Sequence, residues 1–217
     1  MQKAFIFDMD GVLINSEQIW AHYEKTFLIK LLGKEIYEKM GDMIGDNLNS
    51  AYDRAVSFGS TLSKEEFIQA YDEQAAIVYK EVRLAKDTEK LLQFLNQKNF
   101  AIGLVTSSRH VWIDIFLTRF PFLQFSHIIS LTDRQDLKPK PHPDGYKEMI
   151  RTLNAKPKDA IILEDSNRGI ESAKAAGAFV IGFQQNLVPG YKQTGADVYA
   201  RDMNEVIAIV KERSSTI

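Results

Sequence analysis

The 217-residue chain contains no cysteine. Disulfide bonds, thiolate metal sites, iron–sulfur clusters and cysteine nucleophiles are therefore excluded. Long apolar runs are also missing, since the longest, such as residues 178–183, fall far short of the ~20 residues that a membrane-spanning helix needs. The amino end leads directly into a strand-like segment without the pattern of a signal peptide. These absences predict a cytoplasmic protein with no membrane partner.

A surplus of either charge is missing as well. The 27 Lys and Arg residues face 29 Asp and Glu residues, which gives a net charge of -2 at pH 7. Proteins that bind nucleic acid normally carry a clear basic excess, so we expect a small-molecule ligand and no nucleic-acid partner. With 45% hydrophobic and 26% charged residues, the chain has the composition of a globular protein with a sizeable core, which excludes a disordered chain.

Short, β-branched apolar runs predict the strands of a sheet. They occupy residues 4–7, 101–105, 128–131, 160–163 and 179–183. The runs are apolar at consecutive positions, and they alternate with longer helical patterns at residues 87–97, 111–120 and 168–176. Strands of a parallel sheet that is covered on both faces have this pattern. The sequence therefore predicts an α/β fold.

A block of helical patterns interrupts this alternation directly after the first strand. It extends over residues 16–83 and contains no convincing strand pattern. Ser63 and Glu66 have the spacing of a capping box, so a helix is expected to begin there. We therefore predict a core made of residues 1–15 and 84–217 and a helical insertion at 16–83. The insertion explains the length beyond the roughly 150 residues that a doubly wound core needs.

Polar clusters follow the predicted strands at their carboxyl ends. The side chains in these clusters are Asp8 and Asp10, then Thr106, Ser107 and Ser108, then Glu164 and Asp165. Lys138 and Lys140 lie in a Pro-rich loop that precedes a helix starting near residue 144. Ligands of open parallel sheets bind where the carboxyl ends of the strands meet. We therefore expect these clusters to converge on one site.

The residue types in these clusters indicate phosphate chemistry. The acidic side chains would concentrate negative charge that requires a cation, and ligands that are all oxygens suit a hard ion such as Mg²⁺. A lysine, a hydroxyl group and the backbone amides at the start of the helix near Arg109 would form a phosphate cradle. Each cluster alone also fits a turn, a helix cap or a solvated surface. Their joint placement predicts phosphoryl transfer.

The clusters resemble the motifs of the haloacid dehalogenase superfamily, in its phosphatase and β-phosphoglucomutase-like branch. The segments that carry this resemblance are FIFDMDGVL at 5–13, VTSS at 105–108, KPHPD at 140–144 and ILEDS at 162–166. The match covers essentially the whole chain. It implies a Rossmann-like three-layer core with a parallel sheet, a helical-bundle cap inserted after the first strand, and an Mg²⁺-dependent reaction on a small phosphate ester.

The resemblance implies a role for both carboxylates of the first motif. Asp8 would attack phosphorus as the nucleophile and form an aspartyl-phosphate. Asp10 would act as general acid toward the leaving oxygen and then as general base toward the water that hydrolyses the intermediate. Haloalkanoic acid dehalogenation does not use an acid/base carboxylate two residues after the nucleophile. Asp10 therefore favours phosphate esters as substrates.

The later motifs would bind the phosphoryl group and the metal ion. The residues implied for the phosphoryl oxygens are Thr106, Ser107 and Lys140. We prefer Lys140 to Lys138 because the Pro-His-Pro-Asp that follows Lys140 matches the family pattern. The residues implied for Mg²⁺ are Asp8, Asp10 through its backbone carbonyl, Asp165 and, in support, Glu164. The histidines show no metal-ligand spacing and are expected on the surface or in loops.

The cap separates a phosphatase from a mutase. Relatives that resemble β-phosphoglucomutase place a histidine on the first cap helix and an arginine in a cap loop, and the matching positions here hold Trp20 and Leu48. Leu48 cannot hold a phosphate dianion, and residues 15–20 resemble the sugar-phosphate phosphatases. We expect a phosphatase of a sugar or polyol phosphate, with a β-phosphoglucomutase-type mutase as the alternative. Trp20 would pack in the cap or contact the substrate, and Asp46 and Asn47 would line its entrance.

A phosphorylated receiver module is an interpretation from a different class of protein. Receiver domains also combine acidic residues, a phosphorylated aspartate, a hydroxyl residue and a lysine on an α/β scaffold. They phosphorylate an aspartate after a later strand, however, and lack the Asp-x-Asp-Gly pattern and a helical insertion. The enzyme interpretation is therefore favoured, and a monomer is expected because no feature of the sequence indicates an oligomer.

Overall fold

A parallel sheet forms the centre of the core in the computed structural model, which describes residues 2–41 and 48–215. The sheet has six strands in the order β3-β2-β1-β4-β5-β6, and every pair is parallel. The α/β, Rossmann-like prediction is confirmed. The strands are β1 (Gln2–Phe7), β2 (Phe100–Thr106), β3 (His127–Ser130), β4 (Ala155–Glu164), β5 (Phe179–Phe183) and β6 (Val198–Ala200).

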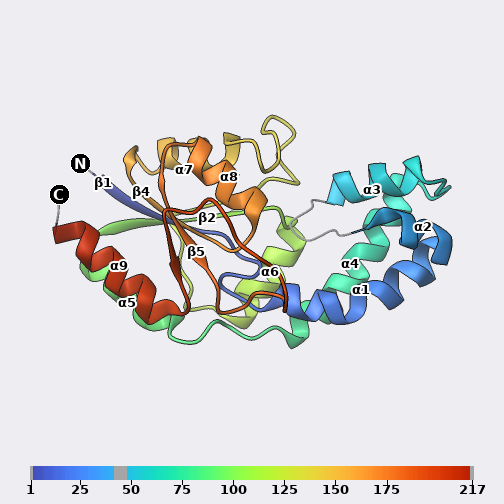
Figure 1. The fold of residues 1–217 in the computed structure, drawn as a ribbon, viewed down its shortest axis with the longest axis horizontal. Helices are drawn as coiled ribbons and strands as arrows, with labels where there is room; N and C mark the ends of the chain where they lie inside the picture. Colours follow the sequence, from blue (N-terminus) through green and yellow to red (C-terminus); the bar gives the residue numbers. More distant parts are fainter. Residues whose placement is uncertain (1, 42–47, 216–217) are drawn as a thin grey trace.

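Alternate residues of β1 pack on opposite faces of the sheet. Phe5 and Phe7 belong to the apolar cluster that includes α5, α6 and α9, whereas Ala4 and Ile6 pack with α7 and α8. Figure 1 shows these two helix layers on either side of the sheet. Burial on both faces explains why the strands are apolar at consecutive positions. The helices are α5 (Thr88–Gln97), α6 (His110–Arg119), α7 (Asp144–Thr152), α8 (Asn167–Ala175) and α9 (Met203–Ser215).

The insertion after the first strand consists of helices, as predicted. Its helices are α1 (Ser16–Leu32), α2 (Lys34–Met40), α3 (Leu48–Ser57) and α4 (Lys64–Glu81). The predicted capping box starts α4, because Ser63 Oγ accepts from the Glu66 amide at 3.2 Å and Glu66 Oε2 accepts from the Ser63 amide at 2.8 Å. Across the described residues, helices that combine the length and the hydropathy of a membrane span are absent.

The chain enters and leaves this cap through two segments that lie side by side. The Asn15 amide donates to the Arg83 carbonyl at 3.2 Å, and the Arg83 amide donates to Asn15 Oδ1 at 2.7 Å. The Ala85 amide also donates to the Leu13 carbonyl at 2.8 Å. The first of these segments follows β1 and the second lies against it, so the cap extends from the carboxyl end of β1 (Figure 1).

Two strands differ from the sequence prediction. β4 begins at Ala155, five residues before the predicted run at 160–163, and its early residues 156–158 are exposed. β6 was not predicted, because it has only three residues and only Ala200 among them is buried. β6 pairs with β5 from Val198 to Ala200, whereas in β4 Ala155 pairs with Gln2 and regular pairing resumes only at Ala160, after a shift of register. Hydrophobic periodicity does not reveal such pairing when the side chains face water.

Candidate active site

The predicted polar clusters meet at one cavity of about 140 Å³ between the core and the cap. The cavity lies at the carboxyl ends of β1, β2 and β4. The strand order reverses beside β1, and such a switch point is the usual ligand site of an open parallel sheet. The core residues that line the cavity are Asp8, Asp10, Thr106, Ser107, Ser108, Trp112, Lys140, Asp165 and Ser166. Convergence of the motifs is therefore confirmed.

Lys140 makes a buried ion-pair bridge between two carboxylates. Its Nζ donates to Asp8 Oδ1 at 2.6 Å and to Glu164 Oε1 at 2.5 Å. The side chains of Lys140, Asp8 and Glu164 are 5%, 8% and 0% exposed. Lys138 is exposed, and its backbone amide donates to Asp144 Oδ2 at 3.0 Å. Of these two lysines, Lys140 therefore lies beside the predicted nucleophile.

The Glu164 carboxylate is surrounded by donors from the protein itself. Oε1 accepts from Lys140 Nζ and from Tyr146 Oη, the latter at 2.7 Å. Oε2 accepts from the Asp165 amide at 3.0 Å, the Ser166 amide at 3.1 Å and Ser166 Oγ at 3.2 Å. These bonds compensate a fully buried charge. Glu164 is therefore placed to orient Lys140 and Asp165, in keeping with the supporting role that we predict for it.

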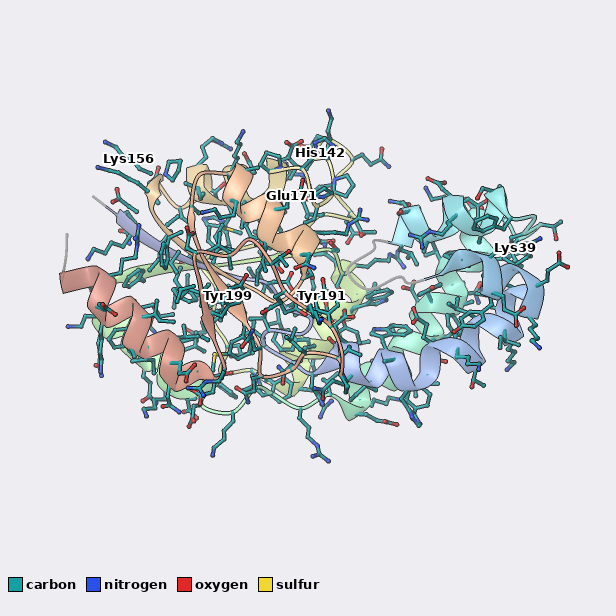
Figure 2. The ribbon with its side chains drawn as sticks, viewed as in Figure 1. Lys39, His142, Lys156, Glu171, Tyr191 and Tyr199 are labelled. Carbon is teal, nitrogen blue, oxygen red and sulfur yellow. The ribbon has the colours of Figure 1, made fainter. Side chains whose placement is uncertain are left out.

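The Glu164 carboxylate occupies the room that the missing side chain of Gly169 leaves. We expect the substitution Gly169→Ala to fill this room. A Cβ atom at this position of α8 would lie 1.8 Å from Glu164 Oε1. The carboxylate would have to leave its donors, so we expect a loss of about 1–3 kcal/mol in the free energy of unfolding. Urea unfolding measures this loss. Glu171→Ala, at an exposed position of the same helix (Figure 2), is the control and should change stability little.

The acidic cluster has the composition of a site for a hard divalent cation. Asp8, Glu164 and Asp165 each offer a carboxylate oxygen within 4.8 Å of the others. Burial raises the pKa of Asp8 and of Asp165; Lys140 opposes this rise at Asp8, and the Glu164 charge raises both pKa values further. A Cβ at Gly11 would lie 1.9 Å from Asp165 Oδ2, so glycine is needed beside this carboxylate. The donor set fits Mg²⁺.

Hydroxyl groups surround the Asp10 carboxylate. Oδ1 accepts from Ser16 Oγ at 2.7 Å and from Tyr79 Oη at 2.6 Å, and Oδ2 accepts from Ser108 Oγ at 2.6 Å. Thr106 Oγ1 lies 3.4 Å from Oδ2. Sequence reasoning did not find Ser16 or Tyr79 as partners of Asp10. Tyr79 is 69 residues away in the cap, and no local pattern links it to the motif.

Two backbone amides at the start of α6, where we predict a phosphate cradle, donate to side chains of the protein. The Ser108 amide donates to Thr106 Oγ1 at 3.0 Å, and the His110 amide donates to Asp133 Oδ2 at 2.7 Å. Side-chain oxygens already satisfy these two amides, as at many helix starts. These two amides are therefore engaged within the protein, and the phosphate cradle stays a prediction for the other amides of this segment. Thr106 and Ser107 line the cavity, as expected.

Aromatic side chains from both the cap and the core also line the cavity. The Trp20 ring lies 5.9 Å from the Tyr71 ring and 6.2 Å from the Trp112 ring, measured between centroids. Trp20 therefore packs against Tyr71 of the cap and also lines the cavity, while its contact with the substrate stays a prediction. Glu17 and Glu24 also line this part. The predicted entrance residues Asp46 and Asn47 lie outside the described residues.

The loop between β5 and β6 supports the site from the core side. Tyr191, which Figure 2 shows toward the cap-facing end of the core, accepts from the Asn167 amide through its hydroxyl at 2.8 Å. Gln193 Nε2 donates to the Asp165 carbonyl at 2.6 Å and to the Phe183 carbonyl at 2.8 Å. These bonds hold Asp165 and the start of α8 in place. Sequence reasoning missed this loop because it carries no motif of its own.

Comparison with known proteins agrees with this geometry. The sequence model of the family described as haloacid dehalogenase-like hydrolase matches residues 5–183. The chain is 28% identical to a validoxylamine A 7′-phosphate phosphatase of Streptomyces hygroscopicus subsp. limoneus, over 95% of this chain and 96% of that protein. It is 26% identical to hexitol phosphatase B of Escherichia coli, over 80% of this chain and 79% of that protein.

Solved structures share the fold. A CbbY structure of Rhodobacter sphaeroides in complex with phosphate aligns with a TM-score of 0.78 and 20% identity, over 95% of this chain and 96% of that one. A β-phosphoglucomutase of Clostridium difficile aligns with a TM-score of 0.77 and 23% identity, over 100% and 98% of the two chains. At these identities the likeness establishes the arrangement of core and cap and does not identify a reaction.

Proposed function

The chain belongs to the haloacid dehalogenase-like hydrolase family, and we propose that it hydrolyses a small sugar or polyol phosphate through a phosphate bound covalently to Asp8, with Mg²⁺ as cofactor. Family membership and the phosphatase relatives identify it as a phosphoric monoester hydrolase. The observation that carries the finer proposal is that Asp8, Asp10, Lys140 and Asp165 line the same cavity.

The first proposed step transfers the phosphoryl group to the protein. A carboxylate oxygen of Asp8 attacks phosphorus while the bond between phosphorus and the leaving oxygen breaks. Asp10 gives its proton to that oxygen, so the leaving group departs as a neutral alcohol. Lys140, 2.6 Å from Asp8, and the Thr106 hydroxyl are placed to offset the charge of the remaining phosphoryl oxygens.

The second proposed step releases phosphate. Asp10 takes a proton from water, the water oxygen attacks phosphorus, and the bond between phosphorus and Asp8 breaks. Asp8 and Asp10 then regain their starting protonation states. Asp8, Asp165 and the Asp10 carbonyl would hold Mg²⁺, with Glu164 in support, and the bound ion supplies positive charge that offsets the negative charge of the phosphoryl group.

The cavity wall favours a leaving group that carries no negative charge in addition to that of the transferred phosphoryl group. Among the described residues that line the cavity, Lys140 is the single basic side chain, and it is engaged at the Asp8 end. The aromatic rings suit the apolar face of a sugar or cyclitol ring, and Glu17 and Glu24 are placed to accept bonds from hydroxyl or amine groups. Relatives are named for validoxylamine A 7′-phosphate and for hexitol, which are consistent with such a leaving group.

The same wall argues against the mutase alternative. A mutase that passes through a bisphosphate needs a cationic group for the second phosphate. Leu48 lines the cavity where a mutase-like relative would offer arginine, and it is 6% exposed. Conversion of β-glucose 1-phosphate into glucose 6-phosphate with a bisphosphate primer would establish the mutase instead.

A screen of phosphorylated metabolites tests the proposed function. With Mg²⁺ present, phosphate release is expected from sugar, polyol or cyclitol monophosphates, and much less from the corresponding bisphosphates. EDTA should stop the release. Failure to release phosphate from any monoester, p-nitrophenyl phosphate included, would contradict a phosphatase assignment.

We expect Mg²⁺ to raise the unfolding temperature more at about pH 8 than at about pH 5. In the metal-free protein, burial raises the pKa of Asp8 and Asp165 above the ordinary value of 3.8. Asp8 and Asp165 therefore stabilise the folded protein in full when the pH lies below their ordinary pKa. This stabilisation is lost as the pH rises through their raised pKa values in the folded protein. Mg²⁺ relieves the repulsion between the ionised groups, and a ligand at about 100 times its Kd stabilises by about 2.7 kcal/mol.

Thermal unfolding with EDTA or with Mg²⁺, at both pH values, measures this effect. Asp165→Asn is expected to remove most of the Mg²⁺-dependent shift because it removes a proposed ligand. Asp136→Asn is the control, since Asp136 is exposed and paired with Arg134 at 2.6 Å. An equal Mg²⁺ shift in the Asp165→Asn variant would mean that the ion binds elsewhere.

A further inference from the structure

The cap contributes a hydroxyl group directly to the Asp10 carboxyl. Tyr79 lies near the end of α4, has no solvent-exposed surface, and places its Oη 2.6 Å from Asp10 Oδ1. The same Oη is 3.0 Å from Ser108 Oγ, which holds the other carboxylate oxygen at 2.6 Å. Asp10 Oδ2 is therefore held by Ser108 of the core, and Asp10 Oδ1 is held by Tyr79 of α4 together with Ser16 at the start of α1, whose Oγ lies at 2.7 Å.

We propose that Tyr79 is a positioning residue for Asp10, which fixes the carboxyl in the orientation that delivers a proton to the leaving oxygen. This inference rests on the proposed function, in which Asp10 is the general acid. Tyr79 itself keeps its proton throughout, and the transferred proton comes from Asp10. A carboxyl that is hydrogen-bonded at both oxygens adopts fewer orientations. The entropic cost of aligning it with the leaving oxygen is therefore a smaller part of the activation free energy.

Burial keeps the Tyr79 hydroxyl a donor. Burial raises the pKa of Tyr79 well above its ordinary value of 10.0, and the Asp10 charge raises it further. The neutral phenol is therefore favoured, and its hydroxyl donates the hydrogen bond to Asp10 Oδ1. A neutral donor orients the Asp10 carboxyl without placing a second charge in the cavity.

The docking of α4 on α6 determines where the Tyr79 hydroxyl lies. Arg119 of α6 donates to the Tyr79 carbonyl, and the Trp112 ring lies 6.1 Å from the Tyr79 ring. Two turns earlier on α4, Asp72 accepts from Arg109 and, at 2.7 Å, from Trp112 Nε1. These contacts join the cap to the core, so the bond from Tyr79 to Asp10 is present when the cap is seated as in this structure.

The test compares two esters of similar size whose leaving groups differ in basicity. p-Nitrophenol departs readily without a proton, whereas benzyl alcohol needs the proton of Asp10. For Tyr79→Phe we expect kcat/KM for benzyl phosphate to fall about 10- to 100-fold, against less than about 3-fold for p-nitrophenyl phosphate, since general acid catalysis contributes about 10²–10⁴-fold. kcat/KM reports the steps up to departure of the alcohol, so the later role of Asp10 as a base does not obscure the comparison.

Tyr23→Phe is the matched control. Tyr23 Oη of α1 donates to Glu81 Oε1 of α4 at 2.7 Å, and this pair is exposed. The variant therefore also removes a tyrosine hydroxyl that donates to a carboxylate, but at a position away from Asp10. Both esters should then be hydrolysed as by the wild type. Ser108→Ala removes the hydroxyl on the other Asp10 oxygen and should show the same selective loss on benzyl phosphate. It provides a second measurement should Tyr79→Phe fold poorly.

The outcomes separate the inference from the function on which it rests. A selective loss on benzyl phosphate in the Tyr79→Phe variant supports positioning. An equal loss of kcat/KM for both esters would overturn the inference, because a purely structural role of Tyr79 would explain it. No loss for either ester would also overturn it, because Tyr79 would then have no role in catalysis. Absence of phosphate release by the wild-type protein, or an Asp10→Asn variant as active as the wild type, would instead remove the proposed function.

Discussion

The Asp8→Asn variant is expected to lose phosphate release from every ester, by roughly 10⁴-fold or more. A neutral amide cannot attack phosphorus as a carboxylate does, and no covalent intermediate would form. The fold should survive, because the amide oxygen can still accept from Lys140, which lies 2.6 Å from Asp8 Oδ1 and keeps its bond to Glu164. Removal of a buried carboxylate whose pKa is raised by burial should not lower stability at neutral pH.

Phosphate release from p-nitrophenyl phosphate in the presence of Mg²⁺ measures this loss. Acid quenching with a radiolabelled ester should trap labelled protein in the wild type and none in the Asp8→Asn variant. Asp136→Asn makes the same chemical change at an exposed carboxylate and should retain full activity. Substantial turnover by Asp8→Asn would show that another group is the nucleophile.

Replacing Lys140 with methionine is expected to cost about 3–5 kcal/mol of unfolding free energy in the metal-free protein at about pH 8. Methionine fills much of the same volume, but it leaves Asp8 and Glu164 buried without a cation. Although burial favours the neutral amine, Asp8 and Glu164 hold the pKa of Lys140 well above its ordinary value of 10.5. Its stabilisation is therefore fully present at about pH 8 and is lost only as the pH rises through that raised value.

The loss caused by Lys140→Met should shrink at about pH 5, because carboxyl groups with raised pKa values become protonated and lose their mutual repulsion. Urea unfolding in EDTA at both pH values measures the difference. Lys138→Met, two residues away at an exposed position, is the control and should change little. Hydrolysis should also fall by about 10²–10³-fold, as for removal of one donor to a developing charge. Equal stability of Lys140→Met and wild type at about pH 8 would contradict the ion-pair bridge.

The sequence predicted the core well because its signals are local. Consecutive apolar residues marked five of the strands, and the spacing of Ser63 and Glu66 marked the start of α4. The site motifs could be found because residues that follow parallel strands meet at one edge of the sheet. β6 was missed, since Val198–Ala200 is short and two of its three residues are not buried.

Several features of the site depend on residues that are far apart in the sequence. Lys140 contacts Asp8 across 132 residues, and the choice between Lys140 and Lys138 rested on resemblance until burial distinguished them. Asp72 belongs to the cap and meets Trp112 of the core across 40 residues. Neither periodicity nor spacing reports such pairs, because both describe only neighbours along the chain.

The sequence by itself determined the fold class, the helical insertion and the polar residues that end the strands, because each depends on the order of residue types within a short window. The tertiary structure alone decided the strand order, the donors around Glu164, the aromatic wall of the cavity and the contact of Tyr79 with Asp10. These features arise when helices and strands from distant parts of the chain pack together. The cap therefore supplies not only a cover for the cavity but also a hydroxyl group at the predicted acid and base.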